Sequence, residues 1–269
     1  MIPFKLNNNI EIPVIGTGTN TFGKVANNYN GELTGDTTPL HSAFELGYRL
    51  IDTAISYRNE DLVGKALQET DIDRKEFFVT SKIPNTPEYS GNDEKVSESV
   101  KASLRKLQVD YIDLYLIHHP LESSERNRAV WRILEEFVDS GQIRSIGVSN
   151  FNQEQLKDLI DHARIKPVVN QVESHPGAWN DDLIAFTQAQ GLVAEAWGPF
   201  WGVNEPIIAA LTPIRQKYNK SWAQVILRYQ FERQVVVIPK SHNPEKQRQN
   251  LDIFNFQLSA EDKEIIKAL

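Results

Sequence analysis

The sequence contains no cysteine among its 269 residues. A disulfide framework, a zinc–thiolate site and a thiol nucleophile are therefore excluded, and the absence is compatible with a reducing cytoplasm. No stretch approaches the roughly 18 consecutive apolar residues that a membrane span needs. The N-terminus also lacks a basic segment followed by a long apolar run, as a signal peptide would have. We therefore expect a cytoplasmic protein with no membrane partner.

Basic residues are in the minority, since 29 Lys and Arg face 36 Asp and Glu and give a net charge of −7. Without a basic stripe, no nucleic-acid partner is expected, although a small basic cluster can still hold an anionic cofactor. The length is close to that of one (β/α)8 barrel, about 250 residues. A single domain over residues 1–269 is predicted, and we expect a monomer, with a dimer left open.

Short β-branched or aromatic segments recur eight times, separated by segments with helical periodicity. They cover residues 14–18, 49–52, 77–82, 112–118, 143–149, 168–173, 193–197 and 235–239. This alternation predicts an α/β fold, a (β/α)8 TIM barrel, with an open doubly wound sheet as the alternative. Segments 4–6 and 10–12 flank three asparagines and predict a β-hairpin at the bottom of the barrel.

Three successive predicted strands end in ionisable residues, Asp52, Lys82 and His118, and Tyr57 follows the first of them. In a barrel the C-terminal ends of the strands meet at one face, so the four side chains could share a pocket. An adjacent ammonium such as Lys82 lowers the pKa of a tyrosine, and Asp52 could orient that lysine. His118 could donate a hydrogen bond to a substrate oxygen or help relay the proton. Together they suit general acid catalysis at a carbonyl oxygen.

Five blocks of the sequence resemble the signature motifs of the aldo-keto reductase family, in family order and near family spacing. They are residues 47–59, 116–120, 147–151, 170–176 and 238–241. The chain is most similar in type to bacterial members with a short C-terminus, such as diketogluconate and aldehyde reductases. The resemblance implies an NADP-dependent oxidoreductase that transfers a hydride between nicotinamide and the carbonyl carbon of an aldehyde or ketone.

The resemblance also implies a role for each residue at the strand ends. It makes Tyr57 the general acid, with Lys82 and Asp52 tuning it and His118 orienting the carbonyl. The substrate pocket that it implies contains Asn20, Tyr57, His118 and His119.

Cofactor-binding positions follow from the same resemblance. Asn150 and Gln171 would hold the nicotinamide carboxamide, because an amide side chain can both donate and accept hydrogen bonds. Residues 240–246 would clasp the adenosine 2′-phosphate beside the N-terminus of a short helix. The full implied set is Gly18, Thr19, Asn20, Asp52, Ser149, Asn150, Gln171, Trp197, Gly198, Lys240, Ser241, Asn243, Lys246, Gln249 and Asn250.

The chain departs from the family pattern at several of these positions. Lys246 stands where arginine is usual and cannot make an arginine fork, so NADPH is expected as the cofactor with NADH use not excluded. Trp197 stands where a tyrosine stacks on nicotinamide, and indole can do the same. Asn20 and His119 stand where tryptophans are common, so a more polar pocket is expected.

The walls and the mouth of the pocket are less defined by the sequence. Phe22, Tyr29 or Trp201 could supply an apolar wall. Segment 25–36 is expected to be a mobile surface loop rather than a lid. Because the sequence ends soon after its last predicted helix, we expect an open pocket that admits small aldehydes, ketones and dicarbonyls.

Two other functions remain open, namely an NADP(H)-binding redox sensor with little turnover and a Schiff-base aldolase that uses Lys82. A Rossmann fingerprint at residues 16–18 is rejected because the third glycine is missing. No metal site is expected either, since His118 and His119, as neighbours on a strand, should point to opposite faces.

Overall fold

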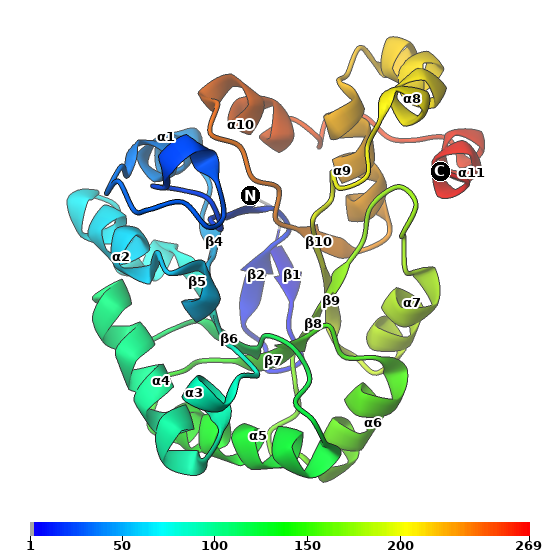
Figure 1. The fold of residues 1–269 in the computed structure, drawn as a ribbon. Helices are drawn as coiled ribbons and strands as arrows, with labels where there is room; N and C mark the ends of the chain where they lie inside the picture. The colour runs from blue at the N-terminus through cyan, green and yellow to red at the C-terminus, as the bar shows by residue number, and fades with distance from the viewer. Residues whose placement is uncertain (1–2) are drawn as a thin grey trace.

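A computed structural model describes residues 3–269. A sheet of eight parallel strands forms its centre, with helices around it (Figure 1). The strands are β3 (Gly16–Gly18), β4 (Leu50–Asp52), β5 (Phe78–Ile83), β6 (Leu114–Ile117), β7 (Ile146–Ser149), β8 (Val169–Glu173), β9 (Val193–Trp197) and β10 (Val235–Val237). Each strand pairs with the next in sequence order. A parallel bridge between Ile15 and Val237 joins the first to the last. The predicted barrel is therefore confirmed, and the open doubly wound sheet is excluded.

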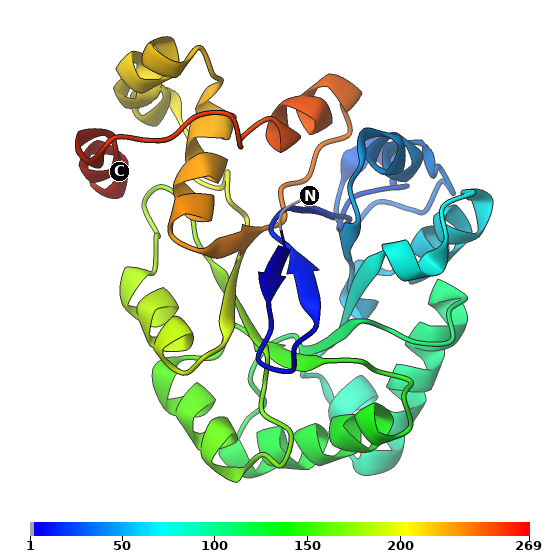
Figure 2. The ribbon, with the colours of Figure 1, turned by 180° about the vertical axis from the view of Figure 1, so that it is seen from behind.

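The N-terminal segment forms the predicted hairpin. Strands β1 (Pro3–Lys5) and β2 (Glu11–Pro13) pair antiparallel and lie across one end of the barrel, as the view from behind shows (Figure 2). Leu6 and Ile12 are buried against barrel residues such as Leu50 and Phe78. The hairpin thus closes the bottom of the barrel and leaves the opposite end, where the strands terminate, for a site.

Helices surround the barrel (Figure 1). They are α1 (Thr38–Leu46), α2 (Glu60–Glu69), α3 (Pro87–Ser90), α4 (Asp93–Leu107), α5 (Ser124–Asp139), α6 (Gln153–His162), α7 (Asp181–Ala189), α8 (Glu205–Tyr218), α9 (Trp222–Glu232), α10 (Pro244–Leu251) and α11 (Ala260–Lys267), with 3₁₀ turns η1 (Val25–Asn27), η2 (Ile55–Tyr57) and η3 (Arg74–Glu76). Local signals explain their bounds. Ser259, for example, starts α11 with a reciprocal capping box to Asp262. None of the helices within residues 3–269 is long and apolar enough to cross a bilayer.

The strands are apolar on both faces because they separate two layers of core. Alternate residues such as Leu116 and Val169 fill the barrel interior, and their neighbours pack outward against the helices. Trp131 and Trp179 are buried in this outer layer, which agrees with a packing role. Because each strand is packed on both faces, its C-terminal end is held in place. Side chains at these ends are therefore fixed relative to one another.

Candidate active site

A cavity of about 690 Å³ opens at the C-terminal ends of the strands. Asp52, Tyr57 and His118 line it, and Lys82 lies fully buried behind them. The structure therefore brings together the four residues that the sequence placed on three successive strand ends. The remaining lining residues are Gly18, Thr19, Asn20, Thr21, Tyr29, His119, Ser149, Asn150, Gln171, Trp197, Gly198, Pro199, Phe200, Trp201, Ile238 and Lys240.

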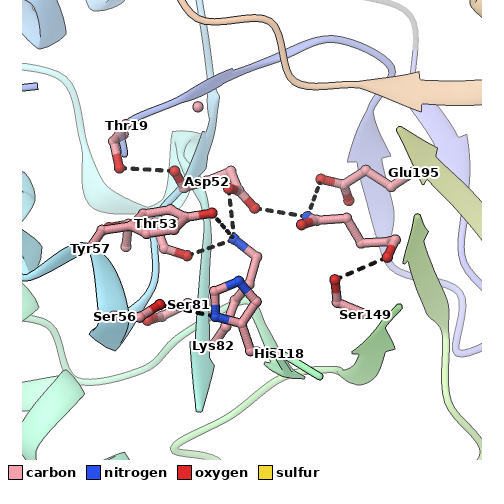
Figure 3. Close-up of polar contacts among 12 residues, drawn as sticks. Thr19, Asp52, Thr53, Ser56, Tyr57, Ser81, Lys82, His118, Ser149 and Glu195 are labelled. Carbon is pink, nitrogen blue, oxygen red and sulfur yellow. Dashed lines mark hydrogen bonds and ion pairs between the residues drawn. The ribbon is translucent and has the colours of Figure 1, made fainter. Parts of the chain in front are cut away.

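Lys82 is the centre of the polar cluster (Figure 3). Its Nζ donates to Asp52 Oδ1 at 2.7 Å, to the carbonyl oxygen of Thr53 at 2.9 Å and to the hydroxyl of Tyr57 at 3.4 Å. Burial by itself would lower the pKa of Lys82. The negative charge of Asp52 leads the effects that outweigh burial, and the hydrogen bond to Asp52 adds to it, so this pKa lies above its ordinary value. The lysine therefore stays an ammonium, whereas a Schiff-base nucleophile has to be a free amine.

The pKa of Tyr57 does not follow the sequence-based expectation. Burial raises it from 10.0 to about 12, and the opposing effect of Lys82 is too small to offset this. Lys82 does lower the pKa of Tyr57, as expected. Burial raises this pKa by more, so the expectation of a lowered pKa was wrong. Tyr57 thus carries its proton throughout the neutral range.

His118 is a neutral imidazole. Burial, followed by the positive charge of Lys82, lowers its pKa to about 2. Its Nδ1 lies 3.1 Å from the Ser56 hydroxyl (Figure 3). If that hydroxyl donates, the ring proton stays on Nε2, and the ring can donate to a group in the cavity. Proton relay through an imidazolium is not compatible with so low a pKa.

The two adjacent histidines do not point to opposite faces. The rings of His118 and His119 are stacked, with centroids 4.8 Å apart and planes inclined by 15°. The prediction failed because β6 ends at Ile117, so the alternation of a strand does not extend to these residues. Within the described part of the chain no group of three or more His, Cys, Asp or Glu side chains is close enough to hold a metal ion.

Gln171 joins the cluster through a contact that the sequence did not indicate. Its Nε2 donates to Asp52 Oδ2 and to Glu195 Oε1, both at 2.9 Å. Both amide hydrogens are therefore used, and Gln171 can offer the cavity an acceptor but no donor. Glu195 was missed because a single Glu inside an apolar strand carries no motif. The sequence did offer one clue. Glu195 lies two residues before Trp197 on the same strand, so the two side chains share the face that points into the barrel.

Asn150 has a left-handed backbone with φ of 62° and its side chain is fully engaged. The amide nitrogen lies within 3.2 Å of the His118 carbonyl oxygen, His119 Nδ1 and Ser149 Oγ. Its oxygen accepts a hydrogen bond from Trp197 Nε1 at 2.8 Å. A ligand carboxamide would have to replace one of these contacts.

Segment 25–36 contributes one wall. Lys24 Nζ and Arg58 Nη2 both donate to the carbonyl oxygen of Tyr29, at 2.7 and 3.0 Å. The Tyr29 hydroxyl donates to the carbonyl oxygen of Ser56 at 3.1 Å, and its ring meets the Tyr57 ring edge-on at 6.1 Å. The loop is thus tied to the site by defined contacts, while its mobility stays a prediction.

Of the other aromatic candidates, Trp201 lines the cavity and Phe22 does not. Trp201 packs edge-on against Trp197 at 5.2 Å and remains 61% exposed. Phe22 is fully buried in the core. Gly198 has φ of +62°, and a Cβ there would lie 3.3 Å from the Trp201 ring, which explains glycine at this position.

The strand β3 side of the cavity is formed by backbone and small polar groups. Thr19 Oγ1 donates to the carbonyl oxygen of Asp52 at 3.0 Å. Asn20 Oδ1 is buried without a hydrogen-bond partner among residues 3–269. Thr21 Oγ1 lies 2.9 Å from His242 Nε2, another contact that the sequence did not indicate.

The predicted phosphate clasp lies at the start of α10. Asn243 caps the helix by accepting from the backbone N–H of Lys246 at 3.1 Å, and Ser241 Oγ accepts from the N–H of Asn243. Lys240 lines the cavity, whereas the Lys246 side chain is exposed. Two lysines therefore lie near the N-terminus of α10, Lys240 just before it and Lys246 in its first turn.

The two positions predicted near adenine differ from each other. Gln249 donates to Glu245 Oε1 at 3.2 Å on the outer face of α10. Asn250 is 4% exposed and lies beside the Tyr48 hydroxyl, so it packs α10 onto the barrel.

Comparison with known proteins identifies the fold's family. The model of the aldo/keto reductase family matches residues 14–203 and 201–269. Glyoxal reductase of Bacillus subtilis (strain 168) is 42% identical over 265 residues, which cover 98% of this chain and 91% of that protein. The 2,5-diketo-D-gluconic acid reductase B of Corynebacterium sp. (strain SHS752001) is 40% identical over 229 residues, 85% of this chain and 82% of that one.

A solved structure agrees with both. The crystal structure of a Bombyx mori aldo-keto reductase in complex with NADP superposes with a TM-score of 0.88 at 33% identity, covering 98% of this chain and 91% of that chain. Family model, relatives and structure coincide over almost the whole length, and the chain belongs to the aldo/keto reductase family.

Proposed function

We propose that the protein reduces aldehydes or ketones to alcohols with NADPH, with Tyr57 as the general acid. Its family indicates an oxidoreductase that acts on carbonyl groups. The observation that carries the finer proposal is the cavity-lining Tyr57 hydroxyl, 3.4 Å from an ammonium that is itself fixed by Asp52. All these residues come from one chain, so the proposed site is complete in a monomer.

NADP(H) is the proposed cofactor. The related Bombyx mori enzyme was solved with NADP, and three features of this cavity suit such a ligand. The buried Asn20 Oδ1 has no hydrogen-bond donor among the described residues. Buried acceptors normally have such a donor, and a bound ligand could supply it. Lys240 and the N-terminus of α10 suit an anionic group, and Trp197 offers a ring face to a flat one. Bound NADPH would supply the hydride.

The chain's own residues then manage the proton. Neutral His118 can donate through Nε2–H to the carbonyl oxygen and so orient it. As negative charge develops on that oxygen, the Tyr57 Oη proton moves to it. Lys82, held as an ammonium by Asp52, stabilises the phenolate that remains. Each of these groups is already positioned by contacts within the protein, so little reorganisation is needed.

Small dicarbonyl compounds are the proposed substrate class. The two relatives are named as reductases of glyoxal and of a diketo acid. Beside Tyr57 the cavity presents polar groups from Asn20, His118 and His119, which can receive a second oxygen next to the reacting carbonyl. Tyr29, which packs against Tyr57, and Trp201, which packs against Trp197, add aromatic surface to the same cavity.

The test is oxidation of NADPH followed at 340 nm with purified protein and a panel of aldehydes, ketones and dicarbonyls. We expect turnover with dicarbonyls, and we expect Tyr57→Phe to lose about 10²–10⁴-fold in kcat while NADPH binding persists. Tight NADPH binding without turnover on any carbonyl would favour the redox sensor. A borohydride-trapped adduct on Lys82 would favour the aldolase.

A further inference from the structure

Glu195 is a carboxyl group in the barrel interior that the proposed reaction does not use. On β9, Ala194 and Ala196 pack outward, while Val193 and Trp197 pack inward with the barrel core. Glu195 shares the inward phase and has no exposed surface. Branched apolar side chains normally fill such layers, so a carboxyl group here needs a separate explanation.

The contact with Gln171 gives the first part of that explanation. The same amide atom lies 2.9 Å from Glu195 Oε1 and from Asp52 Oδ2. Because Asp52 is paired with Lys82, it is a carboxylate and can only accept, so the atom facing both acids is the amide nitrogen. The amide oxygen of Gln171 is then free to serve the cavity that this residue lines.

The charge balance gives the second part. The charged groups that face Glu195 are Asp52 from β4 and Lys82 from β5, while β8 presents the uncharged Gln171 and β10 presents Val236. Lys82 can neutralise one of the two acids and is paired with Asp52. Glu195 Oε2 has no hydrogen-bond partner within residues 3–269. An unpaired buried carboxylate is costly, so Glu195 keeps its proton.

We propose that Glu195 is a positioning residue that works as a neutral acid, fixing the Gln171 amide with its oxygen toward the cofactor site and leaving the Asp52–Lys82 pair balanced. This inference rests on the proposed reductase function. Burial, followed by the charge of Asp52, raises the pKa of Glu195 to about 8. When Glu195 ionises, a second anion competes for Lys82. The ammonium then stabilises a Tyr57 phenolate less, and proton transfer slows.

Two variants separate the parts of this proposal. Glu195→Gln keeps an acceptor for Gln171 but cannot ionise, and Glu195→Met has a similar size but offers no acceptor. The exposed Glu76 provides a matched control, Glu76→Gln. For each protein, kcat/KM for dicarbonyl reduction is measured from pH 6 to pH 10. The Kd for NADPH is measured at pH 7 without substrate, from the quenching of tryptophan fluorescence.

Wild type and Glu76→Gln should lose activity above about pH 8. Glu195→Gln should keep its activity at pH 7 within about threefold, and its decline should begin at least about one pH unit higher. Glu195→Met should bind NADPH about tenfold more weakly, the effect of losing one hydrogen bond.

Contrary results are distinct from a failure of the reductase proposal. If wild type turns over dicarbonyls and Glu195→Gln declines at the same pH, another group controls the profile and the inference is wrong. Unchanged NADPH binding by Glu195→Met would refute the positioning role. An inactive wild type would instead overturn the reductase function. The Kd values of wild type and Glu195→Met for NADPH would still decide whether Glu195 positions Gln171.

Discussion

Replacing Glu195 by glutamine should make the stability of the protein less dependent on pH. The pKa of Glu195 is raised by burial from its ordinary 4.5 to about 8 in the folded chain. Between these values the folded protein keeps a proton that the unfolded chain has lost. The free energy of unfolding contributed by this group therefore falls as pH rises from 4.5 and levels off above 8. Glutamine does not titrate, so Glu195→Gln should not show this fall in the free energy of unfolding with rising pH.

The magnitude follows from the two pKa values. Each pH unit between 4.5 and about 8 corresponds to about 1.4 kcal/mol. Across the whole titration the advantage of Glu195→Gln relative to wild type should therefore grow by about 5 kcal/mol, of which about 3.5 kcal/mol falls between pH 5 and pH 8. This is a large part of the stability of an ordinary domain, about 5–15 kcal/mol.

Urea unfolding at pH 5, 6, 7 and 8 measures this directly, through the difference in unfolding free energy between variant and wild type at each pH. Comparing the two proteins cancels the titration of all other groups. Glu76→Gln controls for the loss of one negative charge. A difference that stays constant from pH 5 to pH 8 would show that Glu195 is ionised in the fold, which would refute the charge balance argued above.

Three further changes probe other parts of the site. Lys82→Met should destabilise the fold by about 3–5 kcal/mol, because it leaves the buried Asp52 carboxylate without its cation; urea unfolding measures this, and adding Asp52→Asn should restore part of the loss. Lys240→Ala should weaken NADPH much more than NADH in fluorescence titrations, and equal losses would contradict a 2′-phosphate contact. Ser56→Ala should lower kcat several-fold with NADPH affinity unchanged, because His118 loses the hydroxyl at Nδ1; unaltered kcat would mean that the tautomer does not depend on it.

The barrel was predictable because it depends on local patterns. Eight apolar segments alternated with helical periodicities, and each became a strand within a few residues of its expected bounds. Parallel strands in a closed barrel end at one face, so the convergence of Asp52, Lys82 and His118 followed from topology alone. Where the strand pattern stopped, the prediction stopped with it, as His119 shows.

The predictions that failed concerned properties that depend on burial in the folded protein. The sequence gives the types of the groups around Tyr57 but not how deeply they are enclosed, and burial decides the direction of its pKa. The place of Tyr29 likewise depends on Lys24 and Arg58, which are far apart in the chain and meet at one carbonyl oxygen. Glu195 could be assigned to the barrel interior only once the structure showed which residues of β9 face inward and which residue of β8 lies opposite it.

The pKa values bear on the direction of the reaction. A phenol whose pKa is about 12 is ionised to about one part in 10⁴ at pH 8, so a site that needs phenolate as a base starts from a very small population. A developing alkoxide is a stronger base than this phenolate and takes its proton readily. Neutral His118, with its pKa near 2, likewise donates rather than accepts at a carbonyl. In the reaction that we propose, both groups therefore already carry the proton that reduction requires, whereas oxidation would start from the minor phenolate form of Tyr57.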